Sequence, residues 1–257
     1  MVLKIKNISK NFGGISALTD VSFTINEGEI FGLIGPNGAG KTTMFNLITN
    51  IFEPSSGEIM FGEENITGLK SHKITDKGIC RTYQNIRLFS QMTALENVMV
   101  GGHCRSTSGV FKSVFRTKAQ RQEEQQLKEK AEELLELVGL LEFKEVLAEN
   151  LAYGQQRRLE IARALASNPR LLLLDEPAAG MNEKETDSLF DLIKTIQAKG
   201  ITVLIIEHDM PLVMKLCDRI TVLNFGKKLA EGTPEEIQNN QAVIEAYLGS
   251  EEDEGIA

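Results

Sequence analysis

Apolar residues fall into short runs separated by longer segments of helical periodicity in two parts of the chain, residues 30–52 and 168–224. Nearly unbroken runs stand at Ile30–Ile34, Leu171–Leu174 and Ile201–Ile206. A strand is apolar throughout when helices cover both faces of its sheet, which is usual for parallel strands. The pattern therefore predicts an α/β fold with a parallel sheet.

The rest of the chain shows two other periodicities. Residues 1–30 and 57–62 alternate between apolar and polar positions, which predicts a layer of antiparallel strands. Residues 90–150 lack strand signals, and Ala119–Gly139 places apolar residues on one helix face. The members of that face are Leu127, Ala131, Leu134, Leu135 and Val138. We expect one domain over residues 1–250, a helical subdomain at about 90–165, and a disordered acidic tail at 251–257.

Composition narrows the class of protein. The chain has 257 residues, 42% of them hydrophobic, which is enough for a substantial core. No apolar run reaches the length of a membrane-spanning helix, and the N-terminus alternates like a strand instead of forming a signal peptide. The formal charge of −8 disfavours binding to nucleic acid. Cys80, Cys104 and Cys217 show no metal-ligand spacing, so we expect the reduced thiols of a cytosolic protein.

A phosphate-binding pattern, G-x-x-x-x-G-K-S/T, lies between the predicted strand Ile30–Ile34 and a predicted helix. Its glycines let consecutive N–H groups face a polyphosphate, and the helix N-terminus adds a positive dipole end. Lys41 is expected to reach the β- and γ-phosphates, and Thr42 to bind Mg²⁺. The alternative is a glycine-rich turn with a surface lysine. The expected nucleotide-binding residues are Gly35, Pro36, Asn37, Gly38, Ala39, Gly40, Lys41, Thr42 and Thr43.

Two adjacent carboxylates end the run Leu171–Leu174, where a parallel strand meets the ligand crevice of an open sheet. We expect Asp175 to hold Mg²⁺ and Glu176 to orient or deprotonate the attacking water. Both carboxylates beside a triphosphate would repel it without a cation. The alternative is a solvated pair at the end of a strand.

The segment Leu151-Ala152-Tyr153-Gly154-Gln155 precedes a helical pattern and resembles the signature of the ATP-binding-cassette (ABC) ATPases, usually Leu-Ser-Gly-Gly-Gln. Gly154 and Gln155 match it, whereas Ala152 and Tyr153 differ. The resemblance implies an ABC cassette with a RecA-like core, an antiparallel β subdomain and an α-helical subdomain, using ATP and Mg²⁺. It also implies that the signature of one subunit caps the γ-phosphate bound by another. We interpret at least two of Arg157, Arg158 and Arg163 as solvated helix charges.

The resemblance assigns roles to four further residues. Gln84 corresponds to the glutamine that senses Mg²⁺ and links the nucleotide to the membrane partner, and His208 to the histidine that contacts the γ-phosphate. Phe12 corresponds to the aromatic residue that stacks on adenine. Asn182 stands where the family usually has an aspartate in a loop that couples the subunits. Taken alone, Gln84 is equally compatible with a polar loop residue, while a lone histidine such as His208 is more often structural and a phenylalanine such as Phe12 more often belongs to the core.

Four stretches look like the ATPase subunit of bacterial branched-chain amino-acid importers: Arg81–Phe89, Tyr153–Glu160, Glu176–Asn182 and Tyr247–Gly249. This resemblance implies ATP hydrolysis that energises amino-acid import. It implies as partners a second ABC ATPase, identical or different, two transmembrane permease subunits and, indirectly, an extracytoplasmic amino-acid-binding protein. The expected location is cytoplasmic, peripheral on the inner face of the cell membrane. The basic segment Gly101–Arg121 contains Val and Phe residues, and either faces the membrane subunits or is a solvated loop.

Three alternatives remain at this stage. One is an ATPase for lipopolysaccharide transport, which shares the Tyr-Gly signature and the Tyr-Leu-Gly ending. Another is an ABC ATPase that acts on nucleic acid or ribosomes without transport. The last is a regulator that binds ATP and barely hydrolyses it, against which Glu176 and His208 argue. The sequence does not specify which amino acid is transported or which ATPase is the partner.

Overall fold

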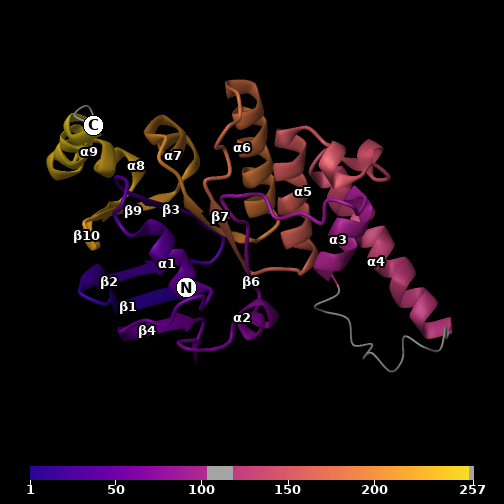
Figure 1. The fold of residues 1–257 in the computed structure, drawn as a ribbon, viewed down its shortest axis with the longest axis horizontal. Helices are drawn as coiled ribbons and strands as arrows, with labels where there is room; N and C mark the ends of the chain where they lie inside the picture. The colour runs from indigo at the N-terminus through magenta and orange to yellow at the C-terminus, as the bar shows by residue number, and fades with distance from the viewer. Residues whose placement is uncertain (103–117, 255–257) are drawn as a thin grey trace.

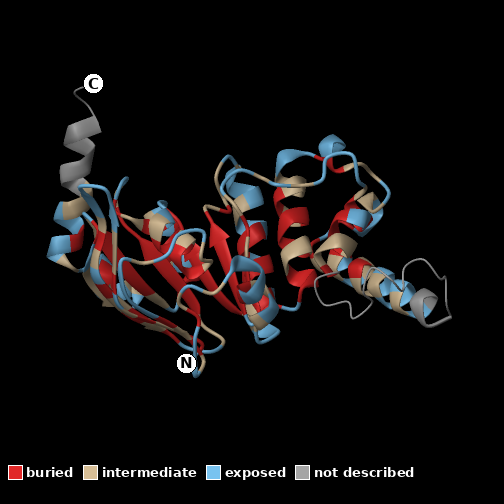
Figure 2. Cartoon of the chain, turned by 60° about the horizontal axis from the view of Figure 1, so that its bottom comes forward, coloured by how far each residue is buried: buried red, intermediate tan, exposed pale blue. Residues whose placement is uncertain are grey.

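The computed structural model describes residues 1–102 and 118–254, which form two β-sheets and a group of helices (Figure 1). A six-stranded sheet has the order β10-β9-β3-β8-β7-β6, and a four-stranded sheet has the order β2-β1-β4-β5. Figure 2 shows that the central strands of the six-stranded sheet are buried along their length, whereas buried residues in the four-stranded sheet are interspersed with more exposed ones. The predicted α/β class with a separate antiparallel layer is confirmed.

The six-stranded sheet contains the predicted parallel strands. Its parallel members are β3 (Ile30–Ile34), β6 (Ile79–Arg81), β7 (Leu171–Asp175), β8 (Thr202–Ile206) and β9 (Arg219–Asn224). The edge strand β10 (Lys227–Gly232) is antiparallel to β9. In β7, Leu172 and Leu174 belong to one buried cluster, while Leu171 and Leu173 belong to another. Burial on both faces explains the four consecutive leucines.

The four-stranded sheet is antiparallel and lies over the helix that follows the phosphate loop. It consists of β1 (Leu3–Phe12), β2 (Ile15–Ile25), β4 (Ser56–Phe61) and β5 (Glu64–Asn65). Val21, Phe23 and Ile25 of β2 are buried at every second position. They share a hydrophobic cluster with Met44 and Phe45 of α1 (Lys41–Ile48), so this sheet packs against α1, the phosphate-loop helix.

Three helices occupy the region predicted to be helical: α3 (Ala94–Gly102), α4 (Lys118–Leu137) and α5 (Tyr153–Ala166). Short 3₁₀ turns at Leu141–Phe143 and Ala148–Asn150 connect α4 to α5. Ala131, Leu135 and Val138 are buried, as the helix face predicts. Among the described residues, no strand lies between β6 and β7. The exact division into a domain and a helical subdomain stays a prediction.

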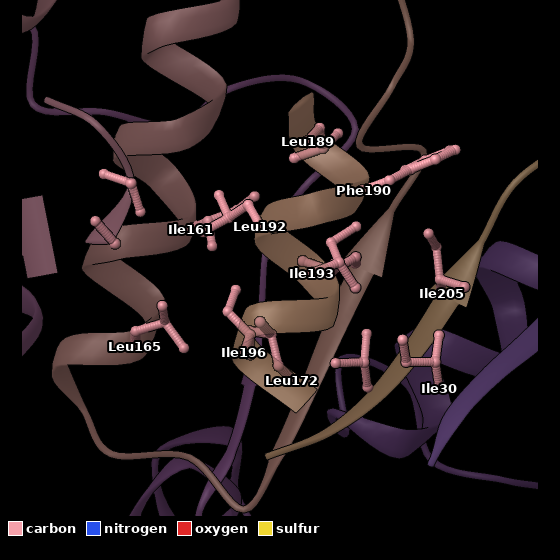
Figure 3. Packing of buried hydrophobic residues seen from close by; sticks show 14 of the residues in the cluster. Ile30, Ile161, Leu165, Leu172, Leu189, Phe190, Leu192, Ile193, Ile196 and Ile205 are labelled. Atoms are coloured by element: carbon pink, nitrogen blue, oxygen red, sulfur yellow. The ribbon is translucent and has the colours of Figure 1, made fainter. Parts of the chain in front are cut away.

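Helices α5 and α6 (Glu183–Ala198) cover one face of the parallel sheet. Figure 3 shows Ile161 and Leu165 of α5 next to Leu192 and Ile196 of α6, above Leu172 of β7. This packing fixes α5 relative to the end of β7. The remaining helices are α2 (Ser71–Lys77), α7 (Met210–Leu216), α8 (Pro234–Gln238) and α9 (Gln241–Glu254).

The acidic tail and the basic segment Gly101–Arg121 are described to different extents. The acidic tail was expected to be disordered, but α9 continues through Glu251–Glu254, because extending an existing helix costs far less than starting one. Most of the basic segment Gly101–Arg121, with Cys104, lies outside the described residues. Within the described part, no helix is both long and apolar enough to span a membrane.

Candidate nucleotide site

The predicted catalytic side chains gather at the carboxyl edge of the parallel sheet. Lys41 follows β3, Gln84 follows β6, and His208 follows β8. Asp175 and Glu176 stand at the end of β7, which pairs with both β6 and β8. Ligands of open α/β sheets bind at this edge, so the topology brings together residues that are far apart in sequence.

The phosphate loop has the backbone that an anion cradle requires. Gly38 and Gly40 have φ angles of 75° and 100°, which only glycine adopts easily. A Cβ at Gly40 would lie 2.7 Å from Leu18 Cδ2, so the loop packs against β2 on that side. A Cβ at Gly38 would meet nothing within 4 Å, which leaves the other side open for a ligand.

Lys41 is the first residue of α1, and its side chain reaches back into this loop. Its Nζ donates to the carbonyl oxygens of Gly35 at 2.6 Å and Pro36 at 3.0 Å. Burial lowers the pKa of the Lys41 amine, while the carboxylates of Glu176 and Asp175 act in the opposite direction. A buried cation next to an open glycine loop fits a polyphosphate.

Asp175 is ion-paired to a residue that sequence reasoning did not select. Arg81 Nη2 donates to Asp175 Oδ2 at 2.6 Å, and the two side chains are only 5% and 4% exposed. Arg81 Nη1 also donates to Asn46 Oδ1 of α1 at 2.7 Å. Its guanidinium lies 5.3 Å from the Phe45 ring centroid and 5.2 Å from that of Tyr83. Arg81 thus connects the phosphate-loop helix to the end of β7.

Glu176 is held at the same edge, with a positive φ of 45°. Gln84 Nε2 donates to Glu176 Oε2 at 2.8 Å, and His208 Nδ1 lies 4.0 Å from Glu176 Oε1. His208 is 61% exposed, whereas Glu176 is 21% exposed. Three of the side chains expected to act together therefore lie within reach of one another.

Glu207 supports the loop after Glu176, although sequence reasoning assigned it no role. Its Oε1 accepts a hydrogen bond of 3.0 Å from the Ala178 backbone N–H. Burial raises the pKa of this carboxyl, and the Ala178 bond opposes the rise. The sequence does carry one signal for Glu207, because this acidic residue directly follows the apolar run Ile201–Ile206.

The donor set suits a magnesium ion held partly by phosphate. Thr42 is exposed at the start of α1, and Asp175 and Gln84 provide further oxygen atoms at the carboxyl edge of the same sheet. In the described chain, no group of three His, Cys, Asp or Glu side chains forms a metal site by itself. Mg²⁺ characteristically takes one or two protein oxygens together with phosphates and waters, so these residues fit it.

The signature segment opens α5, with Ala152 at the N-cap position. Gln155 Oε1 accepts the Ala152 N–H at 3.0 Å, but alanine has no side-chain oxygen to return the bond. Tyr153 is 46% exposed, and its ring lies beside Gly180, where an added Cβ would be 3.3 Å away. The signature residues Leu151, Ala152, Tyr153, Gly154 and Gln155 thus adjoin the loop before α6.

The signature does not adjoin the chain's own phosphate loop. The phosphate loop follows β3, whereas α5 packs against β6, and β8 and β7 lie between these strands. Three strand spacings amount to about 14 Å. Ala152 and Tyr153 are both exposed, which leaves them available to another molecule.

The interpretation of the three α5 arginines as mainly solvated charges was wrong. Arg157 is fully buried, and Arg158 and Arg163 are half-buried. Arg158 donates to Val138 O at 3.0 Å and to Ser188 Oγ of α6. The composition of α5 suggested a charged surface helix, but the helix packs against α3 and α4, and its arginines contact the loop after β6, the segment after α4 and α6.

Phe12 and Asn182 have local partners. Phe12 is 41% exposed at the end of β1, and its ring meets Phe52 edge to face with centroids 5.1 Å apart. The exposed part of that ring leaves room for an adenine. Asn182 caps α6: its Oδ1 accepts the Glu185 N–H at 3.0 Å, and Glu185 Oε2 accepts the Asn182 N–H at 3.0 Å. Its side-chain oxygen therefore serves this chain's own helix.

Comparison with protein families gives two matches. Residues 18–179 match the family described as ABC transporter. Residues 227–253, which comprise β10, α8 and most of α9, match a family described as branched-chain amino acid ATP-binding cassette transporter.

Three curated relatives resemble the chain over nearly its whole length. The high-affinity branched-chain amino acid transport ATP-binding protein BraF of Pseudomonas aeruginosa is 49% identical, covering 96% of this chain and 98% of its own. The corresponding protein LivG of Escherichia coli is 45% identical with the same coverage. The lipopolysaccharide export system ATP-binding protein LptB of Haemophilus influenzae is 34% identical, covering 97% and 98%.

Solved structures share the fold. A nucleotide-free ATP-binding cassette from an ABC transporter has a TM-score of 0.83 at 36% identity. The ADP conformation of the cassette MJ1267 has a TM-score of 0.84 at 35% identity. Both comparisons cover 96% of this chain and 98% of the other.

Proposed function

We propose a function from the premise that the chain belongs to the ABC transporter family of ATP-binding proteins. The chain is the ATP-binding subunit of a branched-chain amino acid ABC transporter, and it hydrolyses ATP to drive transport. The observation that supports this substrate class most directly is the match of residues 227–253, because it lies outside the general ATPase motifs.

The residues at the carboxyl edge of the parallel sheet have different roles in ATP hydrolysis. The N–H groups of the phosphate loop and Lys41 bind the polyphosphate, which replaces the Gly35 and Pro36 carbonyls as the partner of the amine. Thr42, Asp175 and Gln84 hold Mg²⁺, which neutralises charge on the phosphates when bound. Glu176 orients and deprotonates the attacking water, and His208 contacts the γ-phosphate.

The remaining expected contacts involve the nucleoside and a second subunit. Phe12 stacks on adenine. The signature serves the nucleotide of a partner ATPase, since Ala152 and Tyr153 are exposed and their helix packs against β6, three strands away from the β3 that leads into the chain's own phosphate loop. Tyr153 and Gly180 meet at that face, so the signature and the Asn182 loop contact the partner together.

A cavity of about 710 Å³ next to the Gln84 loop suits contact with a membrane subunit. Arg81, Arg87 and Arg163 line it, and Leu88 and Phe89 add apolar surface; none of the described residues that line it is Asp or Glu. These features fit an acidic, partly apolar segment of a permease. The full complex then comprises two transmembrane permeases, two ATPases bound to them on the inner face of the membrane, and an extracytoplasmic binding protein that delivers the amino acid.

Lipopolysaccharide transport is the competing function, because a lipopolysaccharide ATPase is 34% identical. Identities of 45–49% to branched-chain amino acid ATPases and the match of residues 227–253 favour import.

Complementation distinguishes the two. Expression in a bacterium lacking its own branched-chain ATPase should restore uptake of radiolabelled leucine, and Lys41→Ala should not. Rescue of a lipopolysaccharide-export mutant without any effect on leucine uptake would overturn the proposal.

A further inference from the structure

One face of α5 carries a buried ionic cluster directed at the loop that contains Gln84. Tyr153, Arg157 and Glu160 are spaced four and three residues apart, so they lie on the same side of the helix. The side chains of Arg157 and Glu160 are 0% and 1% exposed, and Arg157 Nη1 lies 3.0 Å from Glu160 Oε2. None of the nucleotide-binding roles described above uses this pair.

Arg157 binds the backbone of the Gln84 loop. Its Nη1 donates to the Tyr83 carbonyl oxygen at 2.6 Å, and its Nη2 donates to the Gln84 carbonyl oxygen at 2.7 Å. Nη2 also lies 3.3 Å from the Tyr153 hydroxyl, in the signature itself. A planar guanidinium offers several donors in fixed directions, so it fixes two consecutive carbonyls and the tyrosine together.

Glu160 binds the same loop through its N–H groups. Its Oε1 accepts from the Tyr83 N–H at 3.3 Å and from the Arg87 N–H at 3.4 Å. Burial raises the pKa of the Glu160 carboxyl, and Arg157 opposes that rise. The pair therefore binds both backbone N–H groups and backbone carbonyl groups of residues 83–87.

The side chain of Gln84 completes the connection. While its carbonyl is held by Arg157, its Nε2 donates to Glu176 Oε2 at 2.8 Å. One residue is thus bonded to the signature helix through its backbone and to the carboxylate at the end of β7 through its side chain. A shift of Arg157 therefore alters the bond between Gln84 and Glu176, and a shift of Glu176 alters the bond between Gln84 and Arg157.

Stability alone does not account for this arrangement. Desolvating two charges costs about as much as their attraction returns, and apolar replacements of buried pairs are often neutral or stabilising. The pair does, however, hold residues 83–87 in one position, and this effect depends on the directions of its hydrogen bonds.

We propose that Arg157, paired with Glu160, is a positioning residue that sets Gln84 against Glu176 and ties this contact to the signature helix. The inference rests on the proposed roles of Gln84 and Glu176. Arg157 itself does not touch the nucleotide; it acts through the Gln84 backbone.

The test is the double variant Arg157→Met/Glu160→Gln. It removes both carbonyl bonds and both charges of the buried pair, and keeps an amide oxygen for the Tyr83 and Arg87 N–H groups. The matched control is Arg158→Met, which removes the neighbouring arginine of α5, whose hydrogen bonds within the described part of the chain go to Val138 O and Ser188 Oγ. Amide hydrogen exchange of residues 83–87 is measured without nucleotide, followed by ATPase kinetics with varied Mg²⁺.

The double variant should show exchange at residues 83–87 at least about 10-fold faster than the wild type, because opening of the loop no longer breaks two charge-assisted bonds. Its kcat should fall about 10-fold, with the KM for ATP within about 2-fold and a higher Mg²⁺ requirement. Thermal unfolding should stay within a few degrees, and Arg158→Met should match the wild type in exchange and kinetics. Unchanged exchange and kcat in a folded double variant would overturn the inference.

A second variant covers the case in which the double variant does not fold. Arg157→Lys retains the charge, but its single ammonium group does not reproduce the planar fork, so the same accelerated exchange and lower kcat are expected. Wild-type values for Arg157→Lys would contradict the inference. Absence of ATPase activity in the wild-type chain assembled with its partner ATPase and permeases would refute the proposed function instead, while the exchange data would still test whether Arg157 holds the loop.

Discussion

Gln84 donates a hydrogen bond of 2.8 Å to Glu176, although 92 positions separate the two residues in sequence. The contact exists because β6 and β7 are parallel neighbours, so the residues after both strands reach the same edge. It holds one oxygen of Glu176, while Oε1 faces His208 at 4.0 Å. A general base needs such an orientation to meet a water in line with a phosphate.

Glu176→Gln tests the base directly. It should keep ATP affinity and lower turnover by about 10²-fold or more, because an amide does not accept the proton of water. ATP binding by calorimetry and phosphate release measure the two quantities. Glu142→Gln, an exposed change far from the sheet edge, is the control. An undiminished rate in Glu176→Gln would remove the assignment.

Arg81→Met should destabilise the protein by about 3–5 kcal/mol, because it leaves the Asp175 carboxylate buried without its counter-charge. Arg170→Met is the matched control, since its ion pair with Glu27 is exposed and such pairs contribute about 0–1 kcal/mol. Urea unfolding without Mg²⁺ compares the two variants. Equal losses would show that the Arg81–Asp175 pair contributes no more than a surface contact.

ATP affinity should decrease in alkaline solution. Burial lowers the pKa of Lys41 from its ordinary 10.5, and bound phosphate favours the charged amine. Below the lowered pKa the amine is already protonated, so affinity is insensitive to pH there. As pH rises through that pKa, binding must take up a proton and weakens. Calorimetry in buffers of different ionisation enthalpy would detect the proton uptake; its absence at alkaline pH would contradict this account.

Lys41→Ala removes the titrating group and should lose ATP binding. Any residual binding should have no alkaline transition. A transition that survives in this variant would belong to another group.

Ala152→Ser should raise hydrolysis at the nucleotide bound by the partner subunit. Serine would supply the missing N-cap oxygen, worth about 0.5–2 kcal/mol to the helix, and a donor to the γ-phosphate. The measurement is ATP turnover in the assembled transporter, with the catalytic glutamate of each subunit disabled in turn. No change at either site would show that the backbone N–H groups of the signature already suffice.

The sequence predicted the strands that carry the site because their composition is extreme. Leu171–Leu174 had to be buried on both faces, and the phosphate-loop glycines had to precede a helix. These two features alone place Lys41, Asp175 and Glu176 at one edge.

The sequence did not predict the partners of buried charges. Arg157 looks like any arginine of a polar helix, and its burial depends on the loop 83–87, about 70 residues earlier in the chain, packing against α5. Arg81 was likewise visible only as part of a motif, because its pairing with Asp175 depends on the register between β6 and β7. Long-range pairing, unlike periodicity, leaves no local signal.

Reconstitution tests the central claim most directly. The chain is combined with its permeases and partner ATPase in proteoliposomes that contain ATP, and leucine-loaded binding protein is added outside. The account predicts leucine accumulation with matching phosphate release inside, both lost in Glu176→Gln. Phosphate release that does not respond to the loaded binding protein, or leucine accumulation that persists in Glu176→Gln, would contradict it.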